Sequence, residues 1–167
     1  MGKEKKNTHK FVSFKERISK LRIDVVHSIE KRTETPEECE TFFQQCLSKW
    51  SELNCSLDFQ DFNKEVFPLV KSLSLLVYHQ KTVVEVLLRY LKKKDTLALN
   101  ALLELCVELS RDLQGDFSTY FTDFLRTIAA HLNTKDAEKV EDCFKALAFL
   151  FKFQWRFLVK DMKAVFR

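Results

Sequence analysis

The sequence predicts an all-α protein, an α-solenoid of about three stacked HEAT- or armadillo-like helical hairpins. The chain has only 2 Gly and 2 Pro among 167 residues, whereas sheet proteins need many turn residues. A helix-pair pattern also recurs, opening at residues 87–91 and again at 124–128, each time followed by a polar break and a longer apolar stripe. The spacing of about 37–41 residues is typical of helical repeats, although two amphipathic hairpins can also look alike by chance.

A capping box predicts where the first repeat helix begins. Thr35 is placed as its N-cap, Pro36 at its first helical position and Glu38 where it can bond back to the cap. The apolar spacing carries this helix to about Leu53.

The second helix is expected to begin at Asp58 and to carry apolar residues as far as Leu73. Pro68 lies inside this stretch and predicts a kink, with a complete break as the alternative. The next apolar stripe spans residues 83–91 and ends in the lysine run 92–94. Lysines in a last turn suit the helix dipole, which explains the run more simply than ligand binding does.

Three more helices complete the prediction. Asp95 or Thr96 is expected to begin one that ends before Gly115, the clearest stop signal. Asp116 is expected to cap the next, and Asn133 or Thr134 the one after it. A final apolar stripe, expected to be an unfinished repeat interface, consists of Trp155, Leu158, Val159, Met162 and Phe166.

Four residues at the centres of their stripes are predicted to lie in the core: Leu103, Phe121, Phe124 and Leu147. Val140, Phe144, Leu150 and Phe151 are placed on the inward face with Leu147. Phe149 and Phe153 make that helix apolar on a second side, which predicts burial between two neighbours.

Cysteines and charge describe the environment of the chain. The cysteine count is 5, and no Cys-x-x-Cys pair is present, so a reducing compartment without disulfides is expected. Net charge is +4, and it is uneven. Residues 1–20 hold seven Lys/Arg against two Glu and residues 152–167 hold five against one Asp, which leaves the middle at −5. Basic ends indicate a polyanion or an acidic partner, or simply a solubilising tail and a solvated helix face.

The sequence carries no recognisable catalytic motif. A chain with glycines only at positions 2 and 115 has no Gly-rich phosphate loop. Its four histidines stand apart, and His79 is interpreted as structural. Arg111–Asp112 is either a surface ion pair or a buried clamp between repeats. We therefore expect no enzyme, no cofactor, no metal, no small-molecule substrate and no membrane association.

Short polar motifs at the predicted helix ends are more distinctive than the apolar stripes. They occur in one order along nearly the whole chain: Phe14-Lys-Glu-Arg17, Ile23-Asp-Val-Val-His27, Lys49-Trp50-Ser-Glu-Leu53-Asn54, Leu76-Val-Tyr-His-Gln80, Arg111-Asp-Leu-Gln114 with Asp116-Phe117, and Trp155-Arg156 with Val159-Lys-Asp-Met162. Together they resemble the amino-terminal segment of the large HEAT-repeat component of the small-subunit processome, the down-regulated-in-metastasis family.

The resemblance implies a nucleolar scaffold in small ribosomal subunit biogenesis and precursor ribosomal RNA processing. Its implied partners are processome proteins, the U-three small nucleolar ribonucleoprotein and precursor ribosomal or small nucleolar RNA. The alternative is a helical-repeat adaptor that binds protein peptides and has no RNA role.

The expected organisation has three parts. Residues 1–10 form a disordered basic tail, residues 11–34 pack on the first helices, and residues 35–167 form a helical-repeat domain that begins a longer solenoid.

We predict weak, sequence-independent contact of the basic termini with RNA or acidic partners. The contacting residues are Lys3, Lys5, Lys6, Lys10, Arg156, Lys160, Lys163 and Arg167. The last four recur at helical spacing, so changing them together to Gln should lower the log–log salt slope of RNA binding by about 0.7–0.9 per lost phosphate contact. An unchanged slope with binding intact favours the solvated-face interpretation.

Overall fold

The structure, a computed structural model, describes residues 40–159. Seven α-helices and two 3-10 helices occupy these residues, and no strand occurs among them, so the all-α prediction is confirmed for this part of the chain. The helices are α2 (Phe42–Leu53), α3 (Leu57–Val66), η1 (Phe67–Leu69), α4 (Leu73–Tyr78), α5 (Gln80–Leu91), α6 (Leu99–Leu113), η2 (Gln114–Thr119), α7 (Phe121–His131) and α8 (Ala137–Leu158).

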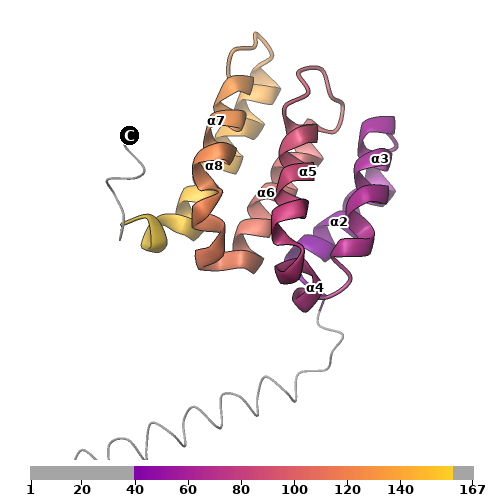
Figure 1. Ribbon diagram of the computed structural model, residues 1–167. Helices are drawn as coiled ribbons and strands as arrows, with labels where there is room; N and C mark the ends of the chain where they lie inside the picture. Colours follow the sequence, from indigo (N-terminus) through magenta and orange to yellow (C-terminus); the bar gives the residue numbers. More distant parts are fainter. Residues whose placement is uncertain (1–39, 160–167) are drawn as a thin grey trace, which may run out of the picture. The chain divides into compact units, whose positions relative to one another are not determined.

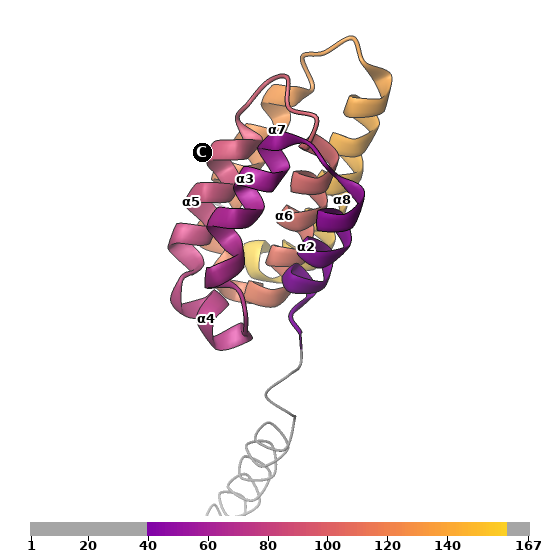
Figure 2. The ribbon, with the colours of Figure 1, turned by 90° about the vertical axis from the view of Figure 1, so that its right-hand side faces the viewer.

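The long helices form two layers, seen edge-on in Figure 2. Helices α2, α6 and α8 make one layer and α3, α5 and α7 the other, and neighbours within each layer are in contact. Across the layers α2 packs on α3, α5 on α6 and α7 on α8, so three helix pairs stand side by side (Figure 1). The two hairpins expected from the recurring sequence pattern correspond to α5–α6 and α7–α8.

Helix α6 lies at the centre of the hydrophobic core. Ten of its fifteen residues are buried, and it contacts α2, α5 and α8. Its Leu103 is buried as predicted, and so are Phe121 and Phe124 of α7. A helix covered on several sides must be apolar over most of its circumference, which the leucine-rich sequence of α6 provides.

The prediction of which α8 residues face inward is partly wrong. Leu150 is buried, but Phe144 and Phe151 are 58% and 42% exposed, and Leu147 is only partly buried. Phe149, predicted to be buried between neighbours, is 47% exposed. The residues that α8 buries are Cys143, Ala146, Leu150 and Gln154. Two of them are small, which lets α8 approach α6 closely, whereas the sequence prediction followed the bulkiest residues.

Gln154 is a polar residue inside this contact. Its side chain is 0% exposed, and its Nε2 donates a hydrogen bond to the carbonyl oxygen of Ser110 at 2.9 Å. Its Oε1 atom is buried and has no hydrogen-bond partner among the described residues. The amide therefore fixes one point of α8 against α6.

Most predicted helix starts differ from the observed ones by a few residues. Ser56 caps α3 in place of Asp58, and Asp58 instead binds Lys93. Asp136 caps α8 in place of Asn133 or Thr134. Asp116 lies within η2, so α7 begins later than expected, at Phe121. Several capping residues stand near each start, and tertiary packing selects among them.

At Pro68 the chain breaks rather than kinks. Helix α3 ends at Val66, Pro68 lies in the 3-10 helix η1, and a separate helix begins after Ser72. The proline ring removes a backbone donor and clashes with the preceding turn, so the α-helical ladder cannot continue through it.

Helix α6 ends just before Gly115 as predicted, but the residue that adopts the unusual backbone conformation is the preceding one. Helix α6 ends at Leu113, and Gln114, not the glycine, has the positive φ of 48°. A Cβ atom on Gly115 would lie 3.3 Å from Cε1 of Phe157. The glycine therefore permits α8 to pass close to this turn.

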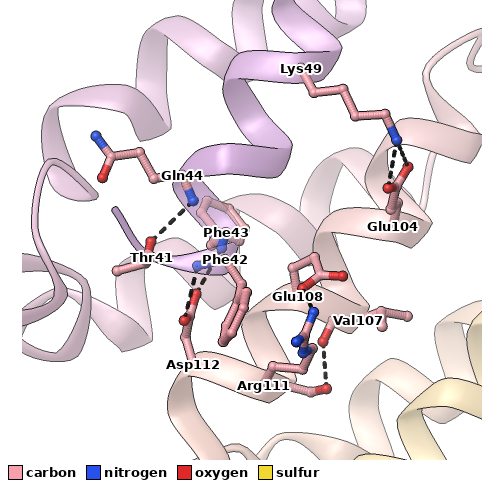
Figure 3. A network of polar contacts seen from close by, with 11 residues as sticks. Thr41, Phe42, Phe43, Gln44, Lys49, Glu104, Val107, Glu108, Arg111 and Asp112 are labelled. Carbon is pink, nitrogen blue, oxygen red and sulfur yellow. Dashed lines mark hydrogen bonds and ion pairs between the residues drawn. The ribbon is translucent and has the colours of Figure 1, made fainter. Parts of the chain in front are cut away.

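The start of α2 is held by a residue 70 positions away (Figure 3). Asp112 on α6 accepts hydrogen bonds from the backbone N–H of Phe42 at 3.1 Å and of Phe43 at 2.8 Å, while the Thr41 hydroxyl accepts from Gln44. Burial raises the pKa of the Asp112 carboxyl even though both N–H groups favour its charged form. Asp112 therefore joins α6 to α2 through backbone N–H groups while only half-buried, so the contact lies between helices but is not the buried Arg111–Asp112 clamp of the second interpretation.

This arrangement corrects the first predicted helix. Glu40 and Thr41 are not helical, so a continuous helix from Pro36 to Leu53 is wrong at these two residues. The predicted capping box of Thr35 and Glu38 lies outside the described residues.

Replacing Asp112 with Ala is expected to destabilise the fold by about 1–2 kcal/mol, because two helix-start N–H groups lose their acceptor. Asp112→Asn, which keeps one acceptor oxygen, is expected to cost less. Urea unfolding midpoints measure both. Asp61→Ala, at an exposed carboxylate 3.6 Å from Lys64, is the matched control and should change stability by less than about 0.5 kcal/mol. An Asp112→Ala variant as stable as the control would contradict a stabilising role for this contact.

Thiol reactivity tests the core independently. Burial raises the pKa of Cys46 to about 12, aided by nearby Glu104 and Glu108, and burial also raises the pKa of Cys106 and Cys143. Cys55 is exposed. In a Cys39→Ser background, one of the four remaining thiols should react rapidly with an aromatic disulfide reagent in the native state, and all four in denaturant. A second Cys55→Ser change should abolish the rapid phase; two or more rapid thiols would contradict the packing.

Candidate interaction surface

The structure describes one of the eight basic residues predicted as contacts. Arg156 is exposed on α8, with its guanidinium 5.6 Å from the ring centre of Phe157. The other seven lie outside the described residues: Lys3, Lys5, Lys6, Lys10, Lys160, Lys163 and Arg167. Their shared use as an RNA-contacting surface stays a prediction.

The predicted terminal stripe is described only in part. Trp155 and Val159 are 61% and 52% exposed, while Leu158 packs partly against the core. Met162 and Phe166 lie outside the described residues. The described part of the stripe thus has exposed apolar side chains at the end of α8, and its use as an unfinished repeat interface stays a prediction.

A groove of about 340 Å³ runs between α6 and α8. Both helices contribute apolar and charged side chains to it. Its lining residues are Asn100, Leu103, Glu104, Val107, Glu108, Arg111, Asp142, Lys145, Ala146, Phe149 and Phe153. We call this the α6–α8 groove. The groove was not predicted from the sequence, because Phe149 and Phe153 were expected to be buried between two neighbouring helices.

A smaller hollow of about 200 Å³ borders the same helix on its other side, between α2 and α6. It shares Glu104, Glu108 and Arg111 with the α6–α8 groove. The outward face of α6 is therefore a ridge of charged residues with a hollow on each flank.

Ion pairs and aromatic rings hold this ridge in place (Figure 3). Glu104 accepts from Lys49 Nζ at 2.8 Å and from the Trp50 indole Nε1 at 2.7 Å. The hydrogen bond that Lys49 donates to Glu104 also raises the pKa of Lys49. These contacts tie α2 to α6 on its outward side.

Arg111 joins the two hollows. It pairs with Glu108 at 2.8 Å, and its guanidinium lies 3.7 Å from the ring centre of Phe42 and 5.3 Å from that of Phe153. The ion pair expected with Asp112 is thus made with Glu108 instead. A planar guanidinium between two rings is held by both charge and stacking, so this part of the surface is preformed.

The chemistry of this surface suits binding. A partner's apolar side chain can lie against Phe149, whose ring stacks on Phe153 with centroids 6.1 Å apart. Polar contacts around it are offered by four charged side chains: Glu104, Glu108, Asp142 and Lys145. No group of three His, Cys, Asp or Glu residues within residues 40–159 is arranged to hold a metal ion. None of the described helices is long and apolar enough to cross a membrane.

Comparison with known proteins gives the relatives of this chain. It is 35% identical over 144 residues to U3 small nucleolar RNA-associated protein 20 of Schizosaccharomyces pombe, covering 86% of this chain and 6% of that protein. It is 29% identical over 171 residues to the protein of the same name from Saccharomyces cerevisiae, covering 97% of this chain and 7% of that protein. No family model matches.

The chain therefore spans a small part of the length of these curated relatives. Similarity over most of this chain to two proteins of one name confirms the resemblance drawn from the polar motifs. The chain is therefore homologous to a segment of the proteins named U3 small nucleolar RNA-associated protein 20.

Proposed function

We propose that this chain is a non-catalytic scaffold segment of small ribosomal subunit assembly, working in the nucleolus beside the U3 small nucleolar ribonucleoprotein. The observation that carries the proposal is its similarity to two proteins named as U3 small nucleolar RNA-associated. The partners proposed are processome proteins and precursor ribosomal or small nucleolar RNA.

The architecture supports an α-solenoid as the form of this scaffold. Helix α7 begins 41 residues after α5, and corresponding helices occupy the same layer. Each helix pair buries its apolar face only by packing on the next pair, which is the principle of helical-repeat arrays. The exposed Trp155 and Val159 on α8 offer a surface for a further pair.

The α6–α8 groove is the surface we propose for protein partners. Its exposed Phe149 supplies the apolar contact that dominates many interfaces, and Arg111 is fixed in place by Glu108 and Phe42. Pre-ordered side chains lose little entropy on binding, so a groove of this kind binds efficiently.

The groove also supports the second candidate function. An adaptor that binds a protein peptide needs the same apolar floor and mixed charges, and needs no RNA contact. The scaffold is expected to be recovered with both partner proteins and U3 RNA, and the adaptor with partner proteins alone. One experiment therefore distinguishes the two functions.

Affinity purification of the tagged chain from nuclear extract is expected to enrich U3 RNA together with processome proteins. Phe149→Glu should lower the recovery of both by about tenfold, because a charge replaces an apolar contact at the groove. Phe144→Glu is the matched control: this ring lies on the same helix, is 58% exposed and lines none of the described hollows, so recovery should not change.

Recovery of partner proteins without U3 RNA would favour the adaptor. Equal losses for the two phenylalanine variants would contradict the assignment of the groove.

A further inference from the structure

A hollow of about 260 Å³ lies where the end of α5 and the loop after it meet α7. Its lining residues are Lys92, Lys94, Arg126, Thr127, Ala130 and His131. We call it the basic pocket. The lysine run was visible in the sequence, but Arg126 and His131 come from a different helix and join it only in the fold.

The charges of the basic pocket have one sign. Lys92, Lys94 and Arg126 line it, and no Asp or Glu does. None of these three cations forms an ion pair with another described residue. Cations that converge on a concave surface without counter-charges raise the local positive potential and attract an anion.

Lys93, the middle lysine of the run, shows the contrast. Its Nζ pairs with Asp58 at 2.7 Å and lies 4.4 Å from the ring centre of Tyr90. The hydrogen bond from Lys93 lowers the pKa of Asp58. Lys93 thus helps to hold the end of α5 against α3, whereas its two neighbours line the basic pocket.

The helix dipole, the simpler explanation from the sequence, accounts less well for Lys92 and Lys94. The carbonyl of Leu88 accepts the backbone N–H of Lys92, and that of Tyr90 accepts the backbone N–H of Lys93. The carbonyl of Leu91 is bonded to His131 Nε2, which must donate because a carbonyl only accepts. Three of the last four carbonyls of α5 therefore have partners without the lysine side chains.

We propose that the basic pocket binds a backbone phosphate of RNA, an inference that rests on the proposed function and assigns an RNA contact to named residues. A guanidinium fork and two ammonium groups match the several acceptor oxygens of a phosphate. No Phe, Tyr or Trp lines the pocket to stack a base, so the contact is to the backbone and has no sequence preference.

The test measures binding of a short single-stranded RNA by fluorescence anisotropy over a range of salt concentrations. The triple variant K92Q/K94Q/R126Q is expected to weaken binding about tenfold and to lower the log–log salt slope by about 0.7, the value for one lost phosphate contact. The control K71Q/K81Q/K135Q removes the same charge from exposed lysines that line none of the described hollows, and should do neither.

A single variant gives an independent reading. Lys94→Glu, which puts a repelling charge in the pocket, should weaken RNA binding more than Lys135→Glu does. Thermal melting of every variant should match the parent, because all the changed side chains are exposed. Equal effects of pocket and control changes would overturn the inference.

Polyglutamate as a competitor separates RNA from an acidic protein partner. It should displace the RNA poorly. Displacement as effective as that by unlabelled RNA, lost in the pocket triple variant, would assign the pocket to an acidic protein and overturn the RNA proposal. Purified components suffice for this assay, so a failure here with U3 RNA still recovered from extract counts against the basic pocket and not against the proposed function.

Discussion

The burial of α6 on several sides at once is the constraint on which the other helices depend. It contacts α2 and α8 within its layer and α5 across the layers, and two-thirds of its residues are buried. One helix can serve three neighbours only if its side chains are apolar nearly all round, which leaves a narrow outward ridge for charge. That ridge is where Glu104, Glu108 and Arg111 lie. The core and the candidate interaction surface are thus two sides of one helix.

The helices were predictable because amphipathic periodicity is a local property of the sequence. Their ends were less so, since the contacts that fix them are distant: the N–H groups that begin α2 bond to Asp112 on α6. The buried face of α8 was misjudged for a related reason. Where α8 packs closely on α6, small side chains fit between the two helices and large ones do not. Cys143 and Ala146 are therefore buried there, and the larger Phe144 is exposed.

The candidate sites divide in the same way. The lysine run at 92–94 is plain in the sequence, but nothing local separates Lys93, which pairs with Asp58, from the two lysines that line the basic pocket. Arg111 was singled out together with Asp112. In the fold, Arg111 pairs with Glu108 on the same helix, whereas Asp112 bonds to the backbone of α2. Adjacent residues on a helix point in different directions, so their partners are known only when the neighbouring helices are placed.

The two proposed binding sites lie on different layers. The α6–α8 groove belongs to the layer of α2, α6 and α8, and the basic pocket is lined by α7 of the other layer and by the loop that follows α5. A protein partner in the groove and an RNA strand at the pocket therefore do not compete for the same residues. A scaffold that holds a protein and an RNA together needs this separation.

Gln154 has a consequence for the geometry of the helix array. An apolar contact between α8 and α6 tolerates sliding, because one methyl group replaces another with little change in energy. An amide bonded to the Ser110 carbonyl does not, since a slide of one helical turn breaks that hydrogen bond inside the core. This residue therefore acts as a register pin between two successive helix pairs. In a long stack of such pairs, small errors of register at each joint would accumulate into a large error of pitch, and one pinned joint limits that accumulation.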